Sequence, residues 1–526
     1  MNIMRVQEIK RVNHNRLEYS YTIEGEWKKY FEPSNPMWVE YSQPVDQVPD
    51  SIAVLPLIGN VIVLASLMDA DIYVDEIDRD FYECIEEFIE GFDSIMPDHV
   101  HFKHRDIVHA NKIVDTPLSP TEQEENLLFF SGGVDATFSL ITHLEEKPAL
   151  VTIWGADIPW DNEDSWKQAI AFNQRIANHH QVKLIPIHSN FRTSFHADNI
   201  NDYSVNLVGN WWWPAFQHGI AMMCLTAPVI CGKRKKLYLA SSFTSDDLKK
   251  LGSIATASAP QIDNHVRLCG CQVVHDANAY SRYNKITHIC RFYEHDEFKP
   301  FLRVCYHSKE GGNCGVCEKC VRDIMSILVA GYDPELYGFR YHKEKIAQNF
   351  AAGLQEMART EKVACISFYQ ELQAAYRAKC SIEQVPLVLR AFYEVDLETL
   401  TDFLHVPNNE CIAKDKILKE VQAKLYDEIG QLRYQAQVER QAYKNERNQI
   451  ARDLTCADAE KQALLHERDC LLDEKRALEA QLQKMYQSTS WKVTKPLRYA
   501  GELRKKSKAK PKDALTEEEK NYSGIK

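Results

Sequence analysis

Short apolar runs alternate with amphipathic stretches between residues 126 and 187, and this alternation restricts the possible folds more than any other feature of the chain. Apolar runs of this length are typical of buried strands, and the stretches between them carry apolar residues at helical spacing. Strands are expected at 127–130, 149–154, 183–187 and 237–240, and helices at 137–144 and 165–179. The pattern predicts an α/β fold with a doubly wound parallel sheet.

The whole chain has 526 residues, of which 44% are hydrophobic, so it is long enough for several domains. Composition and pattern predict an α+β amino-terminal accessory domain at 1–120, the α/β domain at 121–335, a helical region at 336–413, a coiled coil at 414–487 and a basic tail at 488–526. The apolar stretch 51–68 is interrupted by Pro56, which favours a buried helix or strand pair over a membrane span. No signal peptide is recognisable, so we expect a cytoplasmic protein.

A heptad pattern marks the expected coiled coil. Apolar residues recur every seven positions at Ile450, Ala457, Leu464, Leu471, Leu478 and Met485. The complementary positions hold Leu454 and Leu482 but also three bases, Lys461, Arg468 and Lys475. We expect this segment to form a homo-oligomer or to bind a partner protein, with a long solvated helix as the alternative.

Charge divides the chain into an acidic body and a basic tail. Residues 488–512 carry nine Lys or Arg and one acid, which gives +8 against −20 for the remainder and sums to −12. An acidic body is poorly suited to binding nucleic acid, whose phosphates are negatively charged. The tail, with Trp491 among its bases, is expected to contact an anionic membrane peripherally or to be a solvated end.

A glycine-rich segment, Ser131-Gly132-Gly133-Val134-Asp135, joins the first expected strand to the first helix. A glycine pair lets backbone N–H groups turn inward, and the helix contributes its positive end, so the segment predicts a cradle for phosphate. Ser131 and Thr137 could add hydroxyl donors, and Asp135 could hold Mg²⁺ or orient the loop. The alternative is a turn that merely requires glycine.

This segment resembles the loop of the PP-loop ATP pyrophosphatases, the adenine nucleotide alpha hydrolase-like superfamily with its HUP-type sheet. The resemblance implies ATP and Mg²⁺ as cofactors, pyrophosphate release, and AMP left on a substrate oxygen that nitrogen or sulfur then displaces. It implies cofactor contacts from Ser131, Gly132, Gly133, Val134, Asp135 and Thr137. Members usually carry serine after the aspartate, where this chain has Ala136.

Four cysteines, Cys305, Cys314, Cys317 and Cys320, follow the spacing C-x8-C-x2-C-x2-C. Four thiolates presented by tight turns suit a structural Zn²⁺, and Gly315 permits a sharp turn between two of them. An iron–sulfur cluster is the alternative. Zinc would staple this loop-rich segment without doing chemistry itself.

The loop and the cysteines together are similar to the 7-cyano-7-deazaguanine synthase-like (QueC-like) group of PP-loop enzymes. The words 313–315 and 317–322 carry this resemblance, which covers about 126–337. It implies an AMP- and pyrophosphate-forming carbon–nitrogen ligase that adenylates a small-molecule carboxylate or amide oxygen and then uses a nitrogen donor. The substrate does not follow from the resemblance.

Two cations precede the cysteines. Arg282 and Lys285 are three residues apart, so on a helix they share one face and could hold phosphate or a substrate carboxylate. The family carries a lysine in a comparable place, so the resemblance implies a catalytic role for Lys285 with Asp135 and Arg282. Solvated cations on a surface helix are the alternative.

Four further features are hypotheses of lower specificity. His275 and Asp276 are either an acid/base pair or a structural hydrogen bond. Cys269 and Cys271 are either sulfur carriers or inert buried thiols. The other two, Ser241-Ser242 after a strand and Trp211-Trp212-Trp213, are candidate ligand contacts whose alternatives are a turn and core packing.

Three other functions compete with the ligase. Residues 488–498 resemble a word that ends many bacterial glycosyltransferases of surface-polysaccharide clusters, which favours a sugar amidotransferase. An RNA sulfur transferase would require a reactive cysteine near the loop, and Cys269 and Cys271 are the candidates. A non-catalytic nucleotide-binding scaffold would make the coiled coil the working part.

Overall fold

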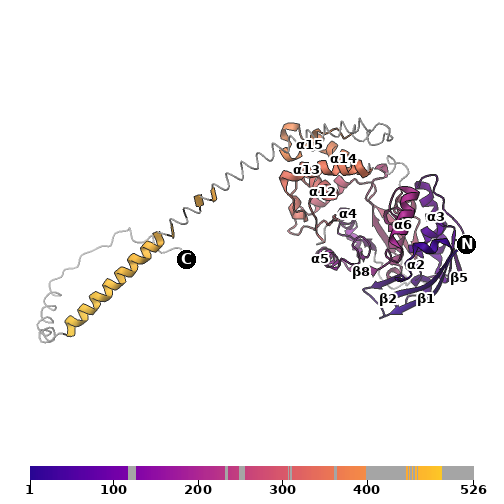
Figure 1. The fold of residues 1–526 in the computed structure, drawn as a ribbon, viewed down its shortest axis with the longest axis horizontal. Coiled ribbons are helices and arrows are strands. Elements are labelled where there is room, and N and C mark those ends of the chain that lie inside the picture. Colours follow the sequence, from indigo (N-terminus) through magenta and orange to yellow (C-terminus); the bar gives the residue numbers. More distant parts are fainter. Residues whose placement is uncertain are drawn as a thin grey trace. The chain divides into compact units, whose positions relative to one another are not determined.

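A computed structural model gives the fold of the chain (Figure 1). It describes residues 1–116, 126–231, 235–247, 255–305, 307, 311–360, 364–397, 446–447, 449–450, 453, 457–458 and 460–487. The chain separates into two compact units, Met1–Tyr434 and Gln435–Lys526. Of the expected coiled coil, residues 414–445, 448, 451–452, 454–456 and 459 lie outside the described residues, as does the whole expected tail at 488–526.

One mixed sheet runs through the first unit. Its strands are β1 (Asn2–Val12), β2 (Arg16–Glu24), β3 (Trp38–Tyr41), β4 (Ala70–Asp78), β5 (Val108–Val114), β6 (Leu127–Phe129), β7 (Ala149–Trp154), β8 (Leu184–Ser189), β9 (Lys235–Ala240), β10 (Arg267–Leu268) and β11 (Cys271–Asp276). Among the described residues, the eleven strands lie in the order β10-β11-β9-β6-β7-β8-β3-β2-β1-β4-β5. The five neighbours from β11 to β8 are parallel, as the strand–helix alternation predicts.

The amino-terminal strands extend this sheet. β3 pairs with β8 in antiparallel fashion, with Val39 opposite Ser189. One apolar core also includes Met4 and Leu17 from the amino-terminal strands together with Leu127 and Val151 from the parallel ones. The expected boundary at 120 therefore does not divide the sheet or its core.

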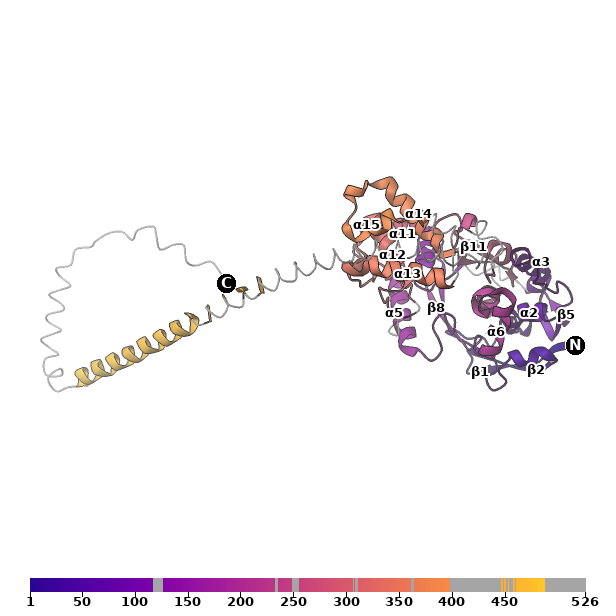
Figure 2. The same cartoon turned by 45° about the horizontal axis from the view of Figure 1, so that its top comes forward.

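Helices cover the sheet and form a second core. Their bounds are η1 (Glu26–Tyr30), α1 (Asp50–Ala53), α2 (Leu55–Leu67), α3 (Arg79–Ile95), α4 (Val134–Thr142), η2 (Leu144–Glu146), α5 (Glu163–His180), α6 (Ala197–Val208), η3 (Trp213–Gln217), α7 (His218–Leu225), α8 (Ala227–Ile230), α10 (Pro260–Asp263), α11 (Arg282–Phe292), α12 (Glu318–Ala330), η4 (Pro334–Tyr337), η5 (Lys343–Lys345), α13 (Ile346–Thr360), α14 (Ala364–Lys379), η6 (Ile382–Gln384) and α15 (Leu387–Glu394). Figure 2 shows α11 to α15 grouped away from β1 and β2. An apolar cluster formed by these helices and α4 places the second core beside the glycine loop.

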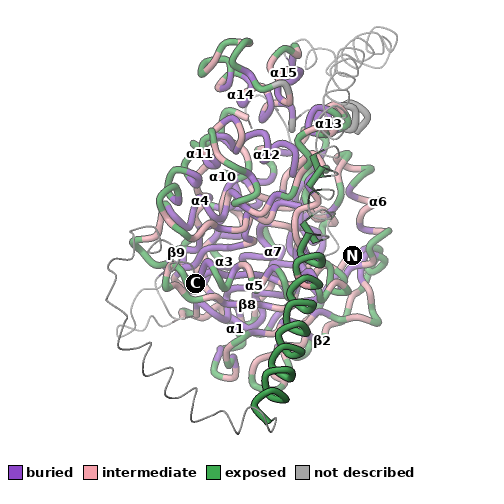
Figure 3. The backbone as a smooth tube through the Cα atoms, turned by 90° about the vertical axis from the view of Figure 1, so that its left-hand side faces the viewer, coloured by how far each residue is buried: buried purple, intermediate pink, exposed green. Residues whose placement is uncertain are grey.

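The apolar stretch 51–68 forms α1 and α2, and every residue from Leu55 to Ser66 is buried. This confirms the expected buried helix. Figure 3 shows the same concentration of buried backbone through the first unit. Within the described part of the chain, no helix combines the length and the apolar character that crossing a membrane requires.

Asn60 is the polar exception inside α2. Its Nδ2 donates to the carbonyl oxygen of Phe191 at 2.9 Å, and Nε2 of Gln217 donates to its Oδ1 at 2.7 Å. All three residues are buried, and the Phe191 carbonyl also accepts from Oγ of Ser194 at 2.8 Å and from Nε2 of Gln217 at 3.4 Å, so the amide of Asn60 belongs to a buried hydrogen-bond network. Asn60 thereby connects α2 to the segment after β8 and to η3.

Substituting Asn60 tests this connection. Asn60→Ala removes one buried hydrogen bond from the Phe191 carbonyl and one from the Gln217 amide, and we expect the free energy of unfolding to fall by about 1–3 kcal/mol. Urea denaturation followed by circular dichroism measures the change. The exposed Asn178→Ala is the control, with an expected change within about 0.5 kcal/mol. Equal effects of the two substitutions would contradict the role given to Asn60.

Candidate nucleotide loop and metal centre

The glycine loop lies between β6 and α4, at the carboxyl end of a buried parallel strand. Gly132 has φ of +78°, a conformation that favours glycine. A Cβ atom there would lie 2.6 Å from Oδ1 of Asn173, so the space is closed as well. Gly133 is the residue that precedes the first turn of α4, and its N–H donates to Oγ of Ser131 at 3.3 Å. Glycine at 132 is therefore required by both backbone conformation and packing.

Behind the loop, Asp135 meets both cations that the sequence singled out. Its Oδ2 lies 2.5 Å from Nη1 of Arg282, and its Oδ1 lies 3.2 Å from Nζ of Lys285. Both cations are on α11, and both are buried. The alternative of a solvated surface helix is therefore wrong, and the three predicted catalytic residues are in contact.

Asp323 on α12 completes the cluster. Its two carboxylate oxygens accept from Nε and Nη2 of Arg282 at 3.0 and 2.7 Å. Two carboxylates and two cations thus share one buried site, which meets the requirement that buried charges be paired. Burial alone would raise the pKa of Asp135, but Arg282 and Lys285 lower it to about 2.

This arrangement limits what Asp135 can do. Mg²⁺ is bound by oxygen ligands directed at the ion, whereas both carboxylate oxygens of Asp135 already face a cation. The donor set does not fit a magnesium site at Asp135. Its role in this geometry is to position Arg282 and Lys285.

The two residues after Asp135 face the interior. Ala136 lies in an apolar cluster with Leu128 and Tyr238. Thr137 is fully buried, and its Oγ1 has no hydrogen-bond partner among the described residues. The hydroxyl expected from Thr137 is therefore not presented at the surface of the loop, unlike that of the partly exposed Ser131.

Arg303 contacts the glycine loop through two hydrogen bonds, and the sequence did not predict this contact. Its N–H donates to the carbonyl oxygen of Gly132 at 2.8 Å, and its Nε donates to the carbonyl oxygen of Ser131 at 3.3 Å. Arg303 comes two residues before Cys305, and Asp323 comes three residues after Cys320. Position next to a predicted metal ligand is the signal that could have identified both residues.

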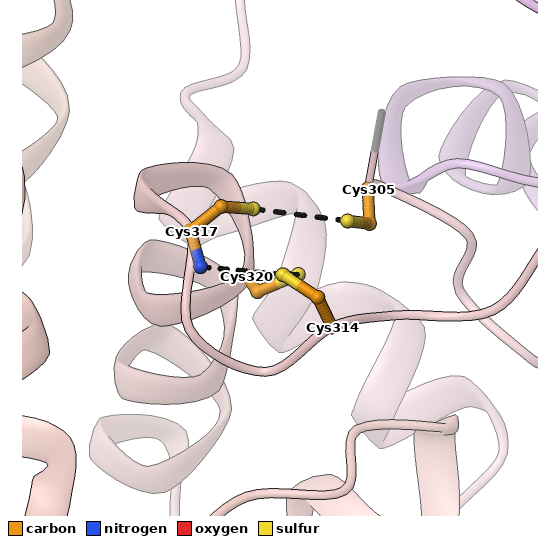
Figure 4. Close-up of side chains that lie close together, drawn as sticks. All are labelled: Cys305, Cys314, Cys317 and Cys320. Atoms are coloured by element: carbon orange, nitrogen blue, oxygen red, sulfur yellow. Dashed lines mark hydrogen bonds between the residues drawn. The ribbon is translucent and has the colours of Figure 1, made fainter. Parts of the chain in front are cut away.

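The four cysteines converge as their spacing predicts (Figure 4). Sγ of Cys305 and Sγ of Cys317 are 3.8 Å apart, as are those of Cys314 and Cys320, and all four sulfurs lie within 4.8 Å of one another. A tetrahedral ion with metal–sulfur bonds of about 2.3 Å requires sulfurs about 3.8 Å apart. The cluster could therefore hold one metal ion such as zinc, and the sulfurs are too close for a cage of several irons between them.

The pKa of Cys317 and the backbone conformation of Gly315 also support a metal centre at the four cysteines. Hydrogen bonding with Cys320 lowers the pKa of Cys317 to about 5, although burial opposes this effect, and the thiolate is the form that binds metal. The N–H of Cys317 donates to Sγ of Cys314 at 3.3 Å. Gly315 has φ of +71°, and a Cβ atom there would lie 2.2 Å from the carbonyl oxygen of Arg340. Only glycine fits between these ligands.

His275 and Asp276 do not pair with each other, so both the acid/base pair and the structural hydrogen bond between them are wrong. Adjacent residues on a strand point to opposite faces of the sheet, and these two lie at the end of β11. Nδ1 of His275 lies 2.7 Å from Oδ2 of Asp263, whereas Asp276 accepts from Oγ of Ser139 at 2.5 Å.

The remaining candidates have different surroundings. Cys269 and Cys271 are buried, and burial raises the pKa of Cys271 to about 12, which leaves no accessible thiolate for sulfur transfer. Trp212 is buried against Phe216, as core packing predicts, whereas Trp211 is 66% exposed. Both serines lie at the charged cluster: Oγ of Ser242 is 3.4 Å from Oδ2 of Asp135, and the carbonyl oxygen of Ser241 accepts from Nζ of Lys285 at 2.5 Å.

A second polar group follows β7 and β8, and sequence reasoning missed it. Nη1 of Arg192 donates to the carbonyl oxygen of Ala156 at 2.5 Å, and its guanidinium lies 4.4 Å from the ring centroid of Trp213. The Trp213 ring is 5.0 Å from that of His218. Burial lowers the pKa of His218, with Asp157 acting in the opposite direction. Ala156 and Asp157 follow β7, and Arg192 follows β8, so these three residues come from the same edge of the parallel sheet as the glycine loop, which follows β6.

The metal centre predicts a contrast between two glycines. Gly315 and Gly209 share φ of +71°, but a Cβ atom at Gly209 would meet nothing within 4 Å. Gly315→Ala should reduce bound zinc from about one ion per chain to a small fraction of that, because Arg340 must move and the ligands separate. Gly209→Ala, which carries only the backbone strain of about 1–2 kcal/mol, should retain its zinc. Elemental analysis of the purified variants measures this, and equal zinc contents would contradict the prediction.

Acid should weaken the contribution of Asp135 to stability. Its pKa is about 2 in the folded chain, against about 3.9 when unfolded, so its full contribution is present above about pH 4 and declines as pH falls toward 2. The gap in unfolding free energy between wild type and Asp135→Asn should narrow by about 1 kcal/mol between about pH 6 and pH 3. Urea titrations at each pH measure the gap. A constant gap would contradict an ionised, paired Asp135.

Comparisons of the chain with protein-family models, with curated proteins and with solved structures find no significant match in any of the three.

Proposed function

We propose that the chain is an ATP-dependent carbon–nitrogen ligase that adenylates a small-molecule carboxylate and then passes the acyl group to a nitrogen donor. The observation that carries the proposal is the glycine loop at the end of a buried parallel strand, backed by the paired charges of Asp135, Arg282 and Lys285. Ligands of open parallel sheets bind outside the carboxyl ends of the strands. The resemblance of the loop to the PP-loop ATP pyrophosphatases supports the choice of ATP.

Backbone groups would hold the phosphates of ATP. The residues Ser131 to Gly133 precede α4, whose first N–H groups and positive dipole end favour an anion. Ser131 adds a hydroxyl. Magnesium would arrive as the complex with ATP, since the carboxylate of Asp135 is already engaged.

The proposed reaction has two steps. A carboxylate oxygen of the substrate attacks the α-phosphorus of ATP, the bond to the bridging oxygen breaks, and pyrophosphate leaves with the electron pair. The nitrogen donor then attacks the acyl carbon, the bond to AMP breaks, and the nitrogen loses a proton to solvent. Arg282 and Lys285 would offset negative charge near the departing pyrophosphate, within a site that Asp135 holds in place.

Zinc, where it is bound, would act on structure alone. Four thiolates fill a tetrahedral coordination sphere and leave no open position for substrate. The ion would fix Cys305, and two residues before it Arg303 holds Gly132. The metal centre would thereby stabilise the loop that receives ATP.

Pyrophosphate release tests the proposal directly. Purified protein of known zinc content is incubated with ATP, Mg²⁺, ammonium and a panel of deazapurine, sugar and amino-acid carboxylates. We expect pyrophosphate and AMP with one acid, and a loss of at least about 100-fold in Asp135→Ala and in Gly132→Ala. The exposed Asp75→Ala is the matched control and should keep full activity.

Two results would contradict the ligase. Binding of ATP without turnover across the whole panel would favour a nucleotide-binding scaffold. Turnover that survives both loop substitutions would place the chemistry elsewhere. Circular dichroism and zinc content of each variant separate loss of activity from loss of fold.

A further inference from the structure

Residues 460–487 form a continuous helix in the second unit, and their sequence repeats every seven residues. Each repeat begins with an acid followed at once by a base, and carries leucine four residues after the acid. The acids are Glu460, Glu467 and Glu474, the bases are Lys461, Arg468 and Lys475, and the leucines are Leu464, Leu471 and Leu478. A repeat of exact length seven is typical of a supercoiled helix pair.

The leucines lie on the surface. Leu464, Leu471 and Leu478 are 65%, 59% and 62% exposed, and Leu482 and Met485 continue the same face at 49% and 47%. Figure 3 shows this helix as almost entirely exposed. A row of large apolar side chains in water indicates a surface that another chain covers.

We propose that this face binds a second copy of the chain, as a parallel, in-register, two-stranded coiled coil. In such a pair each leucine packs against the leucine of the same number, so the apolar row covers itself. Leu465 and Leu472 directly follow two of these leucines and flank the same seam. The sequence thus adds two flanking apolar residues to the central row.

Charge selects the second copy as the occupant. In a parallel pair, a side chain at the position of Lys461 enters a space bordered by the residue that precedes the same position on the other helix. That residue is Glu460 of the second copy, and the same relation joins Arg468 with Glu467 and Lys475 with Glu474. Each base also lies opposite the base of the same number on the second copy, and the acid that the identical helix places beside it offsets this repulsion.

An antiparallel pair lacks this complementarity. Reversing one helix brings the row of glutamates at 460, 467 and 474 against the same row of the other copy, where like charges repel. It also sets the bases against leucines. The parallel arrangement is the one in which the row of glutamates lies beside the row of bases of the other copy.

Charge exchange between two variants tests the pairing. One full-length variant carries Glu460→Lys, Glu467→Lys and Glu474→Lys, and the other carries Lys461→Glu, Arg468→Glu and Lys475→Glu. Wild type should have twice the protomer mass in light scattering at micromolar concentration, and each variant alone should have the protomer mass. An equimolar mixture of the two variants should recover the dimer, because each acid then meets a base on the other chain.

Disulfide cross-linking tests direction and register. Leu464→Cys and Leu478→Cys, made separately in a background with Cys411, Cys456 and Cys470 replaced by serine, should each cross-link to the same position of a second copy on mild oxidation. Two helices in antiparallel register can bring only one position onto itself. Asp473→Cys, outside the seam, is the matched control and should cross-link at least 10-fold less.

The outcomes are decisive for this proposal. A monomeric wild type, a trimer or tetramer, variants that dimerise alone, or a mixture that stays monomeric would each overturn it. Cross-linking of only one of the two leucine positions would overturn the parallel register. Because the substitutions lie on an exposed helix, unchanged zinc content verifies that the first unit is intact.

Discussion

The buried pairing of Arg282 with Asp135 and Asp323 is the interaction on which the candidate site depends. Removing one partner of a buried ion pair typically costs about 3–5 kcal/mol, because an uncompensated charge is left without water. Arg282 is the first residue of α11, while its two acids belong to α4 and α12. The apolar contacts of the second core also hold these three helices together, but apolar contacts are not directional. The guanidinium of Arg282 adds directional hydrogen bonds between them.

The metal centre and the glycine loop belong to the same structure. Cys317 directly precedes α12, Cys320 lies in its first turn, and Asp323 follows one turn later. On the other side, Cys305 follows the segment in which Arg303 holds the carbonyl of Gly132. A metal ion in the cysteine cluster would therefore fix both α12 and the outer support of the loop. The cysteines and the glycine loop are far apart in sequence, but only a few side chains connect them in the structure.

Local patterns predicted local structure well, and failed where partners come from distant segments. The alternation of apolar runs predicted β6 to β9, and cysteine spacing predicted the converging thiols, because each signal is contained in a short stretch. The pairing of β3 with β8 has no such signal, so the boundary at 120 misdescribed the sheet. His275 and Asp276 are adjacent in sequence and separated by the pleat of the strand. Asp323 and Arg303 could be predicted only from their position next to the cysteines expected to bind the metal.

The charges behind the loop also determine how it can attract an anion. Asp135 and Asp323 neutralise much of the charge of Arg282 and Lys285, which reduces what these two cations offer a phosphate. The N–H groups of the loop and the first turn of α4 are fixed dipoles that need no counter-ion, so they would add to the attraction of an anion. Fixed dipoles depend on backbone conformation more than on side-chain identity. Gly132, with its positive φ and its close contact to Asn173, is the residue of the loop at which a side chain would be most strained.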